Sequence, residues 1–109
     1  MFVSVRNIDV STYQQMQAEG GVRLVDVRTD AEGAQGVIEG AVHIPLHVLP
    51  LKADELSDGT PTVLYCRTGA RSAQACAFLA SRGPAADVYN LEGGIFGWLR
   101  AGMPLAAPA

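Results

Sequence analysis

Short strand-like segments alternate with helix-like segments along this 109-residue chain. The clearest strands are predicted at residues 22–27, 62–65 and 87–91, where apolar and β-branched side chains cluster between turn residues. Shorter strand-like segments occupy residues 3–5 and 41–44. When a helix separates each strand from the next, the strands pair in parallel and helices cover both faces of the sheet. The chain is therefore predicted to fold as an α/β protein with three layers, α/β/α.

Helices are predicted in the segments that separate these strands. The first follows a cap at Asp9 or Ser11 and runs to about Ala18, because Gly20 and Gly21 stop it. Further helices are predicted at 47–56, 72–82 and 95–101, and residues 29–35 are expected to form a loop with one helical turn.

One domain is predicted to span residues 1–109, because no linker, repeat or low-complexity segment divides the chain. Residues 103–109, which include two prolines, are expected to form a loose tail. The net charge is −3, so the chain lacks the basic footprint of a nucleic-acid-binding protein, and no Lys/Arg cluster suggests a membrane surface. The first six residues do not resemble a signal peptide, and a cytoplasmic protein is expected.

Two cysteines, Cys66 and Cys76, are too few for a disulfide scaffold and form no CxxC pair. Neither a metal site nor a cofactor is predicted. Cys76 lies within a predicted helix, at helical spacing from Ala73 and Ala80, and is expected to be a small buried apolar residue. A disulfide between the two cysteines is not expected, because the helix places Cys76 roughly 7 Å along its axis from the loop.

The segment Cys66–Ser72 (CRTGARS) stands between a predicted strand and a predicted helix. Backbone N–H groups converge in such a turn, and the beginning of a helix carries a partial positive charge. Arg67 and Arg71 add positive charge on either side. These features lower the pKa of a thiol, so Cys66 is predicted to be an ionised nucleophile at neutral pH.

The spacing within this loop separates two kinds of chemistry. Cysteine phosphatase loops follow C-x5-R-[S/T], usually after a histidine, whereas here four residues separate Cys66 from Arg71 and Tyr65 precedes the cysteine. A tighter cradle suits one sulfur atom better than a phosphoryl group with three equatorial oxygens. Sulfur chemistry is therefore favoured, and a Cys-based phosphatase or arsenate reductase is kept as the alternative.

Four segments, in order, resemble the single-domain rhodanese family of sulfurtransferases. They are Leu24–Arg28 (LVDVR), Gly36–Pro45 (GVIEGAVHIP), Cys66–Ser72 (CRTGARS) and Leu91–Trp98 (LEGGIFGW). One such segment alone is a weak signal, but four in the family's order cover nearly the whole chain and are highly specific. Val37 is the main departure, because the family usually has histidine at that position.

The resemblance implies a five-stranded parallel sheet, rhodanese-like, with a catalytic Cys66 at its carboxyl edge. It also implies a ping-pong reaction in which a Cys66 persulfide carries sulfur from thiosulfate or a persulfide donor to cyanide, a thiol or an acceptor protein. Backbone amides and two guanidinium groups would bind the donor anion; this substrate-binding set is Arg67, Thr68, Gly69, Ala70, Arg71 and Ser72. A monomer is expected. A non-catalytic interaction module remains an alternative, although such modules commonly lose the cysteine or the loop charges.

Outside the loop, supporting roles are predicted for Asp26, Arg28 and Glu92. Asp26 and Arg28, separated by Val27, lie at the carboxyl edge of the sheet and are expected to satisfy loop N–H groups or to pair with a residue such as Glu92. His43 and His47 are interpreted as structural histidines, with no acidic partner expected near either.

Overall fold

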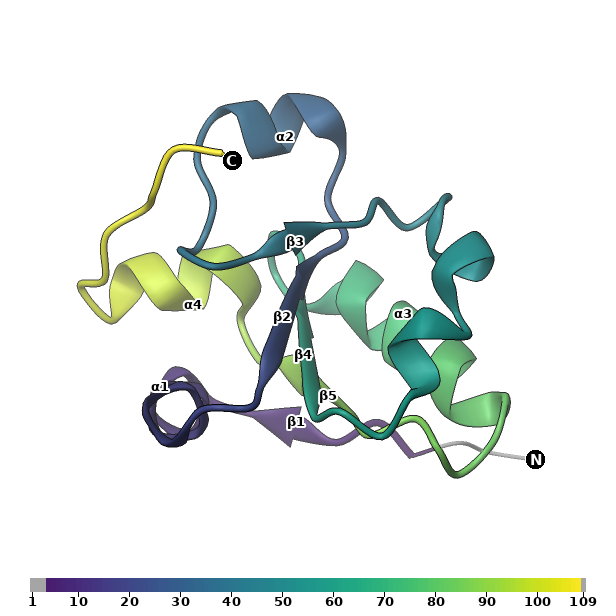
Figure 1. Cartoon of the computed structure of the whole chain (residues 1–109). Helices are drawn as coiled ribbons and strands as arrows, with labels where there is room; N and C mark the ends of the chain where they lie inside the picture. Colours follow the sequence, from purple (N-terminus) through teal and green to yellow (C-terminus); the bar gives the residue numbers. More distant parts are fainter. Residues whose placement is uncertain (1–3, 109) are drawn as a thin grey trace.

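The protein, described here by a computed structural model for residues 4–108, forms one five-stranded sheet in which all neighbouring strands pair in parallel (Figure 1). The strand order is β1-β5-β4-β2-β3. The strands are β1 (Asn7–Ile8), β2 (Arg23–Asp26), β3 (Val42–His43), β4 (Thr62–Tyr65) and β5 (Val88–Leu91). The predicted parallel sheet with five strands is therefore confirmed.

Within the described residues, three α-helices and two short 3-10 helices connect the strands, and a fourth α-helix follows the last strand. They are α1 (Val10–Glu19), α2 (Asp30–Ala34), α3 (Ala70–Ser81), α4 (Gly94–Arg100), η1 (Leu49–Lys52) and η2 (Glu55–Ser57). None of the helices within residues 4–108 has the length and apolar character needed to cross a membrane.

Alternate side chains of the central strands face two different helical layers. Leu24 of β2 and Val63 of β4 pack with α1 and α4 on one face of the sheet. Their neighbours Val25 and Leu64 pack with α3, η1 and η2 on the other face, as the arrangement in Figure 1 shows. All four are at most 4% exposed, so both faces of the central strands are covered, which completes the predicted three layers.

The first strand differs from its prediction at residues 3–5. Val3 lies outside the described residues, and Ser4 and Val5 are not part of a strand. The strand is instead Asn7–Ile8, whose register with Asn90 and Leu91 of β5 is set by backbone pairing rather than by an apolar pattern of its own.

The one helical turn expected within residues 29–35 is present, whereas the segment 47–56 differs from its prediction. Residues 30–34 form the short helix α2, which Thr29 caps by accepting from the backbone N–H of Glu32 at 3.2 Å, while the Glu32 carboxylate accepts from the Thr29 N–H at 3.1 Å. The helix predicted at 47–56 is replaced by η1 and η2, and Pro50 lies in the first turn of η1, where a proline needs no N–H partner.

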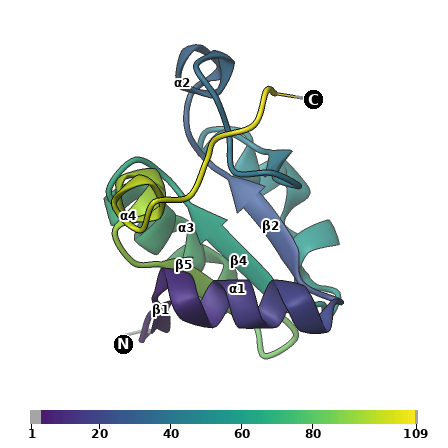
Figure 2. The same ribbon diagram turned by 90° about the vertical axis from the view of Figure 1, so that its left-hand side faces the viewer.

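The C-terminal residues, expected to be loose, are bonded to the rest of the domain. Val37 and Ala106 exchange two backbone hydrogen bonds, at 2.9 and 2.7 Å. The indole N–H of Trp98 donates to the carbonyl of Pro104 at 2.9 Å. Figure 2 shows this segment running from α4 toward α2. The tail is held because Val37 presents free backbone groups that its residues satisfy.

Candidate active site

Cys66 lies directly after β4, in the turn that begins α3. The chain reverses at Gly69, whose φ of +109° is a conformation that side-chain-bearing residues rarely adopt. Cys66 itself is only 1% exposed, so its sulfur lies within the loop rather than on the surface. Cys66 therefore lies between the carboxyl end of the central strand β4 and the beginning of the 12-residue helix α3.

The sulfur of Cys66 accepts hydrogen bonds from its own loop. The Gly69 N–H donates to Sγ at 3.1 Å, and the Ser72 hydroxyl lies 3.4 Å from it. Burial raises the pKa of the Cys66 thiol, but hydrogen bonds from the side chain and backbone of Ser72 and from the Gly69 and Thr68 N–H groups outweigh that effect. The net shift lowers the pKa, which favours the thiolate expected from the sequence.

The first part of the loop is fixed from behind by α4. The N–H of Ile95 donates to the carbonyl of Cys66 at 2.9 Å, and the N–H of Phe96 donates to the carbonyl of Arg67 at 3.2 Å. Gly94 sits so close to these two carbonyls that a Cβ on it would lie 2.5 and 2.6 Å from their oxygens. The first turn of α4 therefore fixes the position of the Cys66 and Arg67 backbone.

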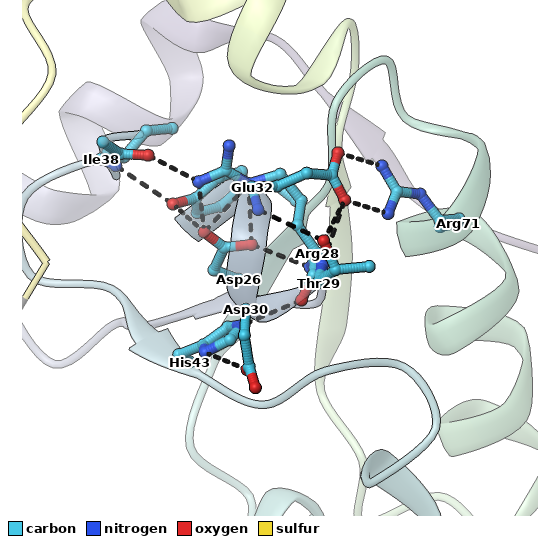
Figure 3. A network of polar contacts seen from close by, with 10 residues as sticks. Asp26, Arg28, Thr29, Asp30, Glu32, Ile38, His43 and Arg71 are labelled. Atoms are coloured by element: carbon cyan, nitrogen blue, oxygen red, sulfur yellow. Dashed lines mark hydrogen bonds and ion pairs between the residues drawn. The ribbon is translucent and has the colours of Figure 1, made fainter. Parts of the chain in front are cut away.

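Arg71 is paired with a residue that the sequence interpretation did not single out. Its guanidinium donates to both carboxylate oxygens of Glu32 in α2, at 2.7 and 2.8 Å (Figure 3). The hydrogen bonds from Arg71, together with those from Thr29, lower the pKa of Glu32 to about 2. Arg71 therefore links α3 to α2, and its charge beside Cys66 is already partly balanced.

Arg67 has a different environment. Its side chain stacks on Phe96 of α4, with the guanidinium carbon 4.9 Å from the ring centre. It borders a groove of about 360 Å³ whose other walls come from α2, the following loop, α4 and the C-terminal segment. The lining residues are Arg28, Glu32, Gln35, Gly36, Arg67, Ile95, Phe96, Leu99 and Leu105. The loop's two arginines therefore differ: Arg71 is held in a bidentate ion pair, whereas Arg67 faces an open groove.

Asp26 and Arg28 form a buried pair at the carboxyl end of β2. The Arg28 guanidinium donates to Asp26 at 2.7 Å and to the carbonyl of Gly36, also at 2.7 Å. Tyr65 completes the network by donating to Asp26 at 2.8 Å and accepting from the N–H of Ile38 at 3.0 Å. These bonds tie β2 and β4 to the loop that follows α2, which agrees with an architectural role (Figure 3).

Glu92 lies outside this network. It is exposed, its N–H donates to the carbonyl of Ile8, and among the described residues the ion-pair partner of Arg28 is Asp26. Of the two alternatives expected for Arg28, pairing with Glu92 does not occur, because Asp26, two residues away, accepts from both Nε and Nη2 of that guanidinium.

Neither the second cysteine nor a histidine forms a hydrogen bond with the sulfur of Cys66 in the described part of the chain. Cys76 is a free, buried thiol of α3 that packs in the core, and burial raises its pKa to about 12, so the prediction of a small buried residue is confirmed. His43 bonds to the carbonyl of Arg28 through Nε2 at 2.8 Å, a structural contact. The structure does place an acidic group near it, since Nδ1 lies 3.6 Å from Asp30. No group of three or more metal-ligating side chains occurs within residues 4–108.

Two residues at the loop had no place in the sequence interpretation, Glu32 and Asn90. Asn90 of β5 accepts from the Ser72 hydroxyl at 2.5 Å and donates to the carbonyl of Gly69 at 3.2 Å. A signal existed for each: Thr29 and Glu32 have the spacing of a capping box, and Asn90 is a polar residue within an otherwise apolar strand.

Comparison with known proteins identifies the family of the chain. A model of the rhodanese-like domain matches residues 9–101. A sulfurtransferase of Allochromatium vinosum is 46% identical over 105 residues, which covers 95% of this chain and 97% of that protein. The thiosulfate sulfurtransferase GlpE of Glaesserella parasuis is 30% identical, over 85% of this chain and 84% of its own length. The crystal structure of a rhodanese-like domain protein from Staphylococcus aureus is 29% identical, covering 96% of this chain and 100% of the other with a TM-score of 0.83. The chain belongs to the rhodanese-like domain family.

Proposed function

We propose that this protein is a sulfurtransferase in which Cys66 carries a sulfane sulfur as a persulfide. The observation that carries the proposal is the environment of the Cys66 sulfur. It is buried, it accepts from the Gly69 N–H at 3.1 Å, and its pKa is lowered despite burial. A thiolate held in this way needs no general base, because it is ionised before the donor arrives.

The proposed reaction has two displacement steps. In the first, the Cys66 thiolate attacks the outer sulfur of thiosulfate; a new S–S bond forms, the S–S bond of thiosulfate breaks, and sulfite leaves with the electron pair. The loop N–H groups then stabilise the negative charge on the outer sulfur of the persulfide. In the second, cyanide, a thiol or a protein acceptor attacks that sulfur, and the Cys66 thiolate leaves.

The donor is proposed to be a small anion, with thiosulfate or a persulfide as the first candidates. Residues 67–72 would bind it through backbone N–H groups and positive charge. Arg71 is engaged by Glu32, so its contribution is the field it exerts on the cysteine. Arg67, which borders the open groove, is the guanidinium available to contact a sulfonate group.

Initial-rate kinetics with thiosulfate and cyanide test the reaction type. Parallel lines in double-reciprocal plots, with no activity in Cys66→Ala, are expected for a covalent sulfur carrier. Hydrolysis of an aryl phosphate without transfer of sulfur from any sulfane donor would show that the proposal is wrong.

A charge-removal series tests the donor site. Arg67→Ala is expected to lower kcat/KM for thiosulfate more than for an alkyl persulfide (RSSH), which carries no sulfonate group and releases a thiol when Cys66 takes its outer sulfur. Arg82→Ala is the matched control, because it removes the same charge just past the far end of α3, roughly 18 Å from the loop by helical rise. Equal losses with both donors would argue against anion binding by Arg67.

A further inference from the structure

Behind the cysteine loop lies a buried amide, that of Asn90 in β5, which is 4% exposed. Its Nδ2 donates to the carbonyl of Gly69 at 3.2 Å and to Asn7 Oδ1 at 3.0 Å. Because a backbone carbonyl can only accept, this contact fixes the orientation of the amide. The oxygen Oδ1 must then face the hydroxyl of Ser72, which lies 2.5 Å away.

The Ser72 hydroxyl has one proton and two acceptors. Its oxygen is 2.5 Å from Asn90 Oδ1 and 3.4 Å from Cys66 Sγ. Ser72 is fully buried, so solvent does not compete for the proton. A hydroxyl donates one hydrogen bond at a time. When it turns to Cys66 it stabilises a thiolate; when it turns to Asn90 it presents lone pairs to the sulfur, which favours the protonated thiol.

We propose that Asn90 is a positioning residue that competes with Cys66 for the single proton of Ser72 and so sets the balance between thiol and thiolate. The same exchange suits a persulfide. Once Sγ is bonded to a second sulfur, it no longer carries the negative charge, and the Ser72 hydroxyl donates to Asn90 again. The loop N–H groups then donate to the outer sulfur of the persulfide. The inference rests on the proposed role of Cys66 as nucleophile, and not on the identity of the sulfur donor.

Substitution of Asn90 or Ser72 leaves the charged groups around the loop unchanged. Arg67 belongs to the loop and Arg71 to α3, and the carboxylates facing them are Glu32 on α2, bonded to Arg71, and Asp26 on β2, bonded to Arg28. The β5 side contributes only neutral amides, and the first turn of α4 behind the loop carries no charged residue. Substituting Asn90 or Ser72 by an apolar residue therefore changes hydrogen bonding without changing charge.

The experiment measures the pH dependence of Cys66 alkylation by iodoacetamide in four proteins: wild type, Asn90→Leu, Ser72→Ala and the double variant. Ser72→Ala is expected to raise the apparent pKa of Cys66 by about one unit, a roughly tenfold loss of thiolate at low pH. Asn90→Leu frees the hydroxyl for the sulfur and is expected to increase the low-pH rate by roughly threefold. In the double variant this gain should vanish.

Asn7→Ala is the matched control, because it removes the other partner of the Asn90 amide but leaves Ser72 and Gly69 untouched; it should retain the wild-type profile. A purely structural Asn90 would change the alkylation rate by the same factor with and without Ser72, because a displaced loop alters access to the buried sulfur in both backgrounds. The proposal is overturned if Asn90→Leu slows alkylation or leaves it unchanged, or if its effect is the same with and without Ser72. Should Asn90→Leu not fold, an unaltered profile in Ser72→Ala overturns it alone. Alkylation needs no sulfur donor, so failure of sulfur transfer would not obscure this result.

Discussion

Substitution of Gly94 by alanine tests how tightly α4 holds the nucleophile's loop. Gly94 has φ +57°, and an added Cβ would lie 2.5 Å from the carbonyl oxygen of Cys66 and 2.6 Å from that of Arg67. Both obstacles are backbone atoms, so neither can rotate away. The carbonyl of Cys66 must retreat from 2.5 Å to the 3.4 Å of ordinary contact, which weakens the hydrogen bond from Ile95.

The size of the effect follows from two costs. Left-handed backbone costs an alanine about 1–2 kcal/mol, and overpacking of a tight site costs about 1–3 kcal/mol more. Gly94→Ala is therefore expected to lower the free energy of unfolding by roughly 2–5 kcal/mol, or Tm by on the order of 10–20 °C. Gly102→Ala is the matched control, because Gly102 has φ +83° with no atom within 4 Å of an added Cβ. It should lose only the backbone cost, about 1–2 kcal/mol.

Urea unfolding, followed by the fluorescence of the single tryptophan, measures both variants. Alkylation of Cys66 then reports whether the loop has moved: its rate should change in Gly94→Ala and not in Gly102→Ala. Equal losses of stability in the two variants would refute the reasoning, because the contact with the Cys66 and Arg67 carbonyls would then have no energetic consequence.

Two further substitutions test the polar contacts at the edge of the sheet. Glu32→Gln should cost about 1 kcal/mol or less at pH 7, since the pair with Arg71 is partly exposed. The pKa of Glu32 in the folded protein, about 2, lies below its ordinary value of 4.5, so the stability difference should be complete above pH 4.5 and shrink as the pH falls toward 2. A difference independent of pH would contradict an ionic origin. Tyr65→Phe leaves the buried N–H of Ile38 without its partner and removes one hydrogen bond to Asp26, whose oxygen still accepts from Arg28. A loss of about 1–3 kcal/mol in urea unfolding is expected. A loss too small to measure would mean that the network relaxes without cost.

The parts of the fold that the sequence predicts are those governed by local pattern. The strands at 22–27, 62–65 and 87–91 contain β2, β4 and β5, because buried strands need continuous apolar segments. The loop at Cys66 could be located because it joins one of these strands to a long helix. The strand β1 could not be located from the sequence, since its register with β5 comes from backbone pairing between residues more than 80 positions apart.

The parts of the site that escape prediction depend on contacts between distant segments. Glu32 and Arg71 are 39 residues apart, and only the folded chain brings α2 over the loop. Arg28 and Asp26 are only two positions apart, so their pairing is a local contact that does not depend on distant segments. The bonds between Val37 and Ala106, like the pair between Glu32 and Arg71, arise from tertiary structure, so the sequence pattern of residues 103–109 does not reveal them.

The most direct test of the central claim, that Cys66 carries a sulfane sulfur, is the intact mass of the protein. After incubation with thiosulfate and removal of the excess, the wild type is expected to gain the mass of one sulfur atom and to lose it on addition of cyanide. Cys66→Ala should gain nothing, whereas Cys76→Ala should behave as the wild type, because Cys76 is buried with a raised pKa. A wild-type protein that never gains this mass with any sulfane donor, or a Cys66→Ala variant that still gains it, would contradict the account.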